Sequence, residues 1–77
     1  MKLTYDPKHN IGYIRLREKN TGVETLRVSD ELNIDISPDG AVYVIELLNA
    51  NAQLGSETFE DFIIENAETG KSTTVAL

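Results

Sequence analysis

Residues 33–44 read NIDISPDGAVYV, and this stretch predicts a β-hairpin. Pro38 presets the first position of a type I turn, and Asp39 suits the second position. Gly40 adopts at no steric cost the left-handed conformation that closes a three-residue hairpin loop. The flanking residues are rich in Ile, Val and Tyr, which favour strands. The stretch therefore predicts two antiparallel strands joined by a tight turn.

The turn also fixes a register, which can be compared with the pattern of apolar residues. In an antiparallel pair with one buried face, apolar residues should lie opposite one another. The loop satisfies this rule, because it aligns two pairs of branched apolar residues. The predicted pairs are Ser37–Ala41, Ile36–Val42 and Ile34–Val44.

Two further turns of the same kind end in Gly22 and Gly70. Around Gly22, the same rule aligns Lys19 with Val23 and predicts a second hairpin. Its pairs would be Leu16–Leu26, Ile14–Val28 and Arg15–Arg27. The two registers together predict one core, composed of Ile14, Leu16, Leu26, Val28, Ile34, Ile36, Val42 and Val44.

The remaining segments complete a mainly β domain with a minor helix. Residues 2–5 read as a first strand, and residues 47–54 read as a short helix that Gly55 ends. Residues 56–66 fit a helix that buries Phe59, Phe62 and Ile63, but a strand over 62–64 agrees better with the turn at Gly70. We expect one antiparallel sheet of about six to seven strands, built from hairpins, in a single domain over 1–77.

The run ETGKST, residues 68–73, resembles the end of a phosphate-binding loop. That motif needs Gly at position 65, where this chain has glutamate, and it must open a helix after a strand. Residues 72–75 have strand chemistry instead. We therefore interpret this segment as a hairpin turn and expect no nucleotide to bind there.

Composition and charge narrow the functional classes. The chain has 77 residues, no cysteine, one histidine and a net charge of −6. Most basic side chains lie in residues 1–29, whereas ten of the thirteen acidic ones lie in 30–77. The acidic balance argues against nucleic-acid binding, and no apolar run is long enough to cross a membrane. Neither a secretory signal nor a metal site is expected, so a cytoplasmic protein without cofactors is the expectation.

Three arginines are candidate anion ligands. Arg15 would face Arg27, with Arg17 nearby, and like charges opposite each other are destabilising. Asp35, opposite Tyr43, could neutralise them within the chain; alternatively, the arginines await an anionic ligand or an acidic partner. Nothing in the sequence decides between these interpretations.

The acidic side chains suggest few other sites. Glu46 is predicted to point toward the core opposite Leu32, where a carboxylate needs a partner or a shifted pKa. It either reaches water at the end of the sheet or acts as an acid that binds a ligand or transfers a proton. The other acids of residues 30–39 do not fit a calcium loop, and His9 reads as a surface side chain.

The segments Lys2-Leu3-Thr4-Tyr5-Asp6-Pro7 and Tyr13-Ile14-Arg15-Leu16, with Val44-Ile45-Glu46-Leu47-Leu48-Asn49-Ala50 later, resemble a known family. It groups short prokaryotic proteins under a domain-of-unknown-function label. The resemblance covers about residues 2–54 and leaves 55–77 as a C-terminal extension. It implies a small β-dominated domain and no particular activity, although neighbouring toxin genes in some members would imply an antitoxin-like binding role.

These observations favour a non-enzymatic interaction or regulatory module over an enzyme. A basic protein is the expected partner, because residues 30–77 are so acidic; the alternative is a small anion-binding domain that uses the three arginines. We also expect a homodimer. The predicted second face of the sheet remains too apolar for water, and its residues are Tyr13, Val23, Tyr43, Ile45 and Leu47.

Overall fold

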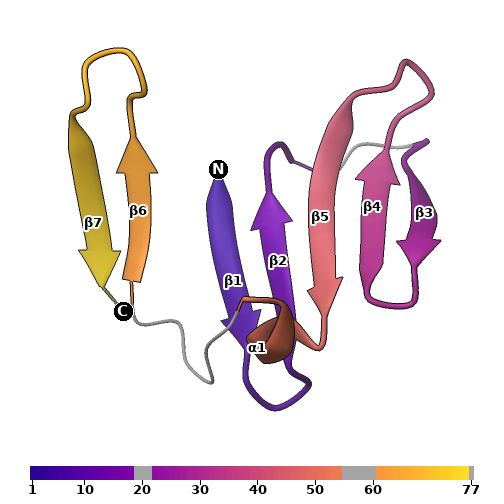
Figure 1. Ribbon diagram of the computed structural model, residues 1–77. Helices are drawn as coiled ribbons and strands as arrows, with labels where there is room; N and C mark the ends of the chain where they lie inside the picture. The colour runs from indigo at the N-terminus through magenta and orange to yellow at the C-terminus, as the bar shows by residue number, and fades with distance from the viewer. Residues whose placement is uncertain (19–21, 55–60, 77) are drawn as a thin grey trace.

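The computed structural model describes residues 1–18, 22–54 and 61–76, which form two antiparallel sheets and one short helix (Figure 1). The elements in chain order are β1 (Lys2–Asp6), β2 (Ile11–Arg15), β3 (Glu24–Ser29), β4 (Leu32–Ile36), β5 (Val42–Leu48), α1 (Ala50–Gln53), β6 (Asp61–Glu65) and β7 (Ser72–Ala76). The mainly β class with a minor helix is confirmed. The single sheet of six to seven strands is not, because five strands form one sheet and β6–β7 form another.

The five-stranded sheet has the order β1-β2-β5-β4-β3. The predicted hairpin between β2 and β3 is therefore wrong, and so are its pairs Leu16–Leu26 and Ile14–Val28. Gly22 does have a positive φ of 85°, but the chain beyond it continues to the far edge of the sheet. A local turn residue fixes the backbone at one point and does not choose the neighbouring strand. The strand that pairs with β2 is β5, which has seven residues and is the longest of the described strands.

The β4–β5 hairpin largely matches its prediction. The Ser37 N–H donates to the Ala41 carbonyl at 2.9 Å, Gly40 has a φ of 90°, and Ile36 pairs with Val42. One step further the register shifts, so that Ile34 pairs with Ile45 and not with Val44 as predicted.

The shift in register is a bulge at Tyr43, on β5. The Tyr43 carbonyl accepts two N–H groups of the chain after β2, from Leu16 at 2.8 Å and from Arg17 at 3.3 Å. An extra residue on one strand moves every later side chain to the other face. Val44 consequently leaves the predicted apolar set, and Ile45 takes its place.

Two other boundaries differ from the sequence prediction. The helix is shorter than residues 47–54, because Leu47 and Leu48 still belong to β5. β6 confirms the predicted strand over residues 62–64, while 55–60 lie outside the described residues. The predicted hairpin before β7 is confirmed, with Gly70 at a φ of 73°, but its loop has four residues and not three: the Asn66 N–H donates to the Lys71 carbonyl and the Gly70 N–H to the Asn66 carbonyl, both at 2.8 Å.

The core of the described residues is very small. Only two apolar residues are buried there, Val44 at 7% exposure and Ala50 at 0%. Ala50 is covered because α1 lies against Gly12 on β2, where an added Cβ would be 3.6 Å from the Ala50 Cβ. Three members of the predicted core, Leu16, Leu26 and Val28, are exposed. The sheet is thus a single layer, with α1 over only one end (Figure 1).

Candidate interaction surface

One face of the five-stranded sheet is apolar. Residues that pair across an antiparallel ladder share a face, so the register assigns each strand residue to one side. We call this side the apolar face; its members are Leu3, Tyr5, Gly12, Ile14, Leu26, Leu32, Ile34, Ile36, Val42, Ile45 and Leu47. Apart from Gly12 and Leu26, all are only partly buried.

Several of these residues lie on a different face from the one predicted from the sequence. Ile45 and Leu47 lie on the apolar face, whereas the prediction put them on the opposite one. Tyr13 does lie on the opposite face, but its neighbours there are polar: it pairs with Thr4 and with Glu46. The signal that could have corrected the prediction is the alternation of Ile45 and Leu47 with Glu46, which only a bulge before Val44 reconciles with the turn.

The opposite, polar face carries most of the predicted site residues. Glu46 lies here between Tyr13 and Asn33, so the prediction that it points toward the core opposite Leu32 was wrong. Asp35 pairs with Val44, not Tyr43, and its carboxylate accepts the Thr25 hydroxyl at 2.6 Å.

The three arginines do not form one cluster. Arg27 is on the edge strand β3, where it binds Asp30 at 2.8 Å, and it pairs with Asn33, not with Arg15. Arg15 is on β2, so β5 and β4 separate it from Arg27. The predicted opposition of Arg15 and Arg27 is therefore wrong. The Arg17 guanidinium lies 6.0 Å from the ring centre of Tyr43, at cation–π distance.

Two of the arginines do share a site with a lysine that sequence reasoning missed. Lys2 pairs with Arg15 across β1 and β2, and both line an open depression of about 300 Å³ together with Arg17. Met1, Leu16 and Glu18 complete the lining. Three cations against one carboxylate make this depression attractive to anions.

A cluster of amide side chains holds α1 against the sheet. Asn10 and Asn49 both have positive φ, 55° and 51°, a region that Asn tolerates better than most residues. The Asn10 side-chain Oδ1 accepts hydrogen bonds from the Tyr5 hydroxyl at 3.1 Å and from the Asn51 N–H at 3.0 Å. The Asn10 backbone carbonyl accepts one from the Ala50 N–H. These contacts fix the start of α1 on the apolar face.

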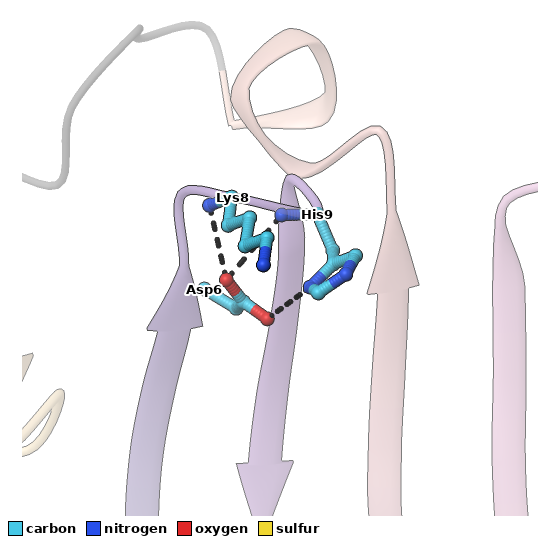
Figure 2. Close-up of polar contacts among 3 residues, drawn as sticks. All are labelled: Asp6, Lys8 and His9. Carbon is cyan, nitrogen blue, oxygen red and sulfur yellow. Dashed lines mark hydrogen bonds and ion pairs between the residues drawn. The ribbon is translucent and has the colours of Figure 1, made fainter.

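The turn between β1 and β2 holds the single histidine. Asp6 accepts the N–H groups of Lys8 and His9 at 3.0 and 3.3 Å, and its second oxygen lies 2.8 Å from the His9 Nδ1 (Figure 2). The hydrogen bond to the His9 ring, more than any other contact, lowers the pKa of the Asp6 carboxyl below its ordinary value of 3.8. This arrangement stabilises a turn and leaves both side chains at the surface.

Asp39 plays a similar part in the β4–β5 turn. It accepts the Ser37 hydroxyl and the Ala41 N–H, and the bond from Ser37 is the main reason that the pKa of Asp39 is lowered. Over residues 1–18, 22–54 and 61–76, no three metal-ligating side chains gather at one place. Within the same ranges, no helix has the length and apolarity that a membrane crossing requires.

The comparisons with known proteins identify a family. A family model described as "Protein of unknown function (DUF2283)" matches residues 2–51. The chain belongs to this family. No curated protein and no solved structure matches it. The DUF2283 match runs from β1 to the start of α1, so it contains the apolar face and the Asn10 cluster, whereas β6 and β7 lie beyond it.

Proposed function

We propose that this DUF2283 protein is a non-enzymatic interaction module that binds another polypeptide through the apolar face of its five-stranded sheet. The observation that carries this proposal is the absence of a second layer over that face among the described residues. A sheet with one apolar face must bury it against another element to be stable. An antitoxin-like or other regulatory role in the cytoplasm is one form of such a module.

The titratable side chains support a binding role over a catalytic one. Two that an active site could use, Asp6 and His9, are engaged with each other in an exposed turn. Asp30 is paired with Arg27, and Asp39 closes a hairpin. An active site usually collects perturbed groups in a cleft, whereas these lie in separate turns.

Photo-crosslinking in cells tests this function. A benzophenone amino acid in place of Leu26 would stand on the apolar face, at a side chain that is 53% exposed. The same amino acid in place of Thr4, exposed on the polar face of the other edge strand, is the matched control. We expect a discrete protein adduct from position 26 and none from position 4. Equal crosslinking at both positions, or none at either, would contradict the proposal.

The depression lined by Lys2, Arg15 and Arg17 supports a second candidate function, the binding of a small anion. Inorganic phosphate and small dicarboxylates should then stabilise the folded chain and raise its thermal unfolding midpoint. At a ligand concentration 100 times the dissociation constant, the free energy of unfolding would rise by about 2.7 kcal/mol. Arg15→Gln should abolish this shift, while Arg27→Gln, which changes an arginine outside the depression, should preserve it. A shift that both variants retain would place the anion elsewhere.

A further inference from the structure

The apolar face is large enough to need a partner of protein size. The chain exposes 5890 Å², whereas a compact monomer of its mass exposes about 4,700 Å². Its radius of gyration is 14.0 Å, against about 11.5 Å for a compact domain of this length. The surplus is about 1,200 Å² per chain, and a stable interface removes roughly 600–1,000 Å² from each partner. The surplus exceeds one such interface, because it includes the exposed β6–β7 hairpin as well as the apolar face; it leaves room for one protein interface on that face.

The charges on the sheet indicate which protein fits. The strand residues Lys2, Arg15, Asp35 and Glu46 all point to the polar face, and the apolar face holds one charged residue, Glu24, at its edge. A strongly basic partner would find only one acidic group, Glu24, at the edge of this surface. Two copies of the chain could meet there with every acidic residue of the sheet except Glu24 on the opposite face, although each copy has a net charge of −6.

We propose that a second copy of this chain covers the apolar face, so that two five-stranded sheets pack face to face in a two-fold dimer. Sheets packed in this way lie about 10 Å apart, with interdigitated side chains. Because α1 stands on the same face over Gly12, the partner covers the part beyond it, around Ile34 and Ile45. This inference rests on the proposed function and names its partner.

The chain's own β6–β7 hairpin is the rival occupant. In Figure 1 it is displaced sideways from the sheet, beyond β1, and covers neither face. Its own apolar residues, including Phe62, Ile64 and Val75, are exposed at 38%, 53% and 45%. An isolated two-stranded hairpin is marginally stable. A fold-back would cover both surfaces in a monomer, and the experiment must therefore separate this outcome from a dimer.

Sedimentation equilibrium of the full chain, from about 1 to 100 μM, measures the mass. We expect twice the chain mass of 8.6 kDa. Leu26→Glu places an unpaired charge in the interface and should raise the dimer dissociation constant at least about tenfold. Thr4→Glu adds the same charge on the polar face and should change it little. Circular dichroism checks that both variants fold, and Leu26→Ser, which adds no charge, should weaken the dimer less.

Thiol labelling identifies what covers the face, because the chain has no cysteine of its own. In Leu26→Cys the thiol should react more slowly with a maleimide at high protein concentration than at low, whereas that of Thr4→Cys should react equally fast at both. A monomer whose thiol at position 26 is protected would mean that β6–β7 folds back. A dimer whose thiol at position 26 reacts freely would mean another interface. Either result overturns the inference.

A monomer in which the thiol at position 26 reacts freely would overturn it too. The crosslinking in cells then decides whether the proposed function survives: an adduct with a different protein at position 26 retains it, and no adduct refutes it.

Discussion

At the scale of single residues, polar side chains in this chain shape turns. Asp6, Asp39 and Asn66 each accept backbone N–H groups two or three residues further along the chain. Such local bonds compete with strand pairing and favour turns where strands end. The turns at Gly40 and Gly70 were predictable because Asp, Pro and Gly have local effects that need no knowledge of the fold.

Asp6 and His9 give a prediction for pH dependence. The ionised Asp6 carboxylate stabilises the folded chain at every pH above the unfolded-state pKa, near 3.8, and this contribution is lost as the pH falls through the lower folded pKa. Carbonyl-carbon NMR titration should thus give an Asp6 pKa below 3.8. In His9→Ala the value should rise toward 3.8, because the principal cause of the shift is gone. An unchanged value in that variant would show that backbone N–H groups alone hold the carboxylate.

At the scale of elements, the docking of α1 depends on Gly12. A Cβ at this position would meet the Cβ atoms of Ala50 and Leu47 at 3.6 and 3.8 Å, which are ordinary contacts. Gly12→Ala should therefore be neutral, or stabilising by up to about 1 kcal/mol through the unfolded state. Gly12→Val should overpack the contact and cost about 1–3 kcal/mol. Urea denaturation compares the two, and equal stability would mean that α1 does not rest on β2.

The β6–β7 hairpin gives a second prediction at this scale. Gly70→Val puts a β-branched residue at a φ of 73° and should cost on the order of 1–3 kcal/mol. Lys71→Ala changes the neighbouring residue and should have almost no effect. Amide hydrogen exchange over 61–76 reports both. If the two variants lost protection equally, the left-handed turn would not be what defines the loop.

The elements also show how much of the fold could be predicted from the sequence. The residues of β1, β4 and β6, the first part of β5 and the turns at Gly40 and Gly70 were predictable, because periodicity and turn chemistry are local. The place of β5 beside β2 was not predictable, because it depends on competition among all strands. No single residue type indicates the bulge at Tyr43, and only the alternation of Ile45 and Leu47 with Glu46 points to it. Because the predicted register lacked this bulge, it placed Val44, Ile45 and Glu46 on the wrong faces of the sheet.

At the scale of the whole molecule, the separation of charged and apolar residues between the two faces gives the proposed dimer a characteristic response to salt. Two copies with a net charge of −6 repel each other, and added salt screens that repulsion within a Debye length of about 10 Å at 0.1 M. The apolar contact itself is insensitive to such screening. The dimer should therefore tighten between low and moderate NaCl concentrations.

A complex held by opposite charges would respond in the reverse direction. If the acidic residues of 30–77 bound a basic protein, salt would weaken that complex and slow its formation. Sedimentation equilibrium of the chain alone at about 20 and 300 mM NaCl gives the sign for self-association. A dimer that loosens as salt rises would mean that ion pairs, and not the apolar face, join the two copies.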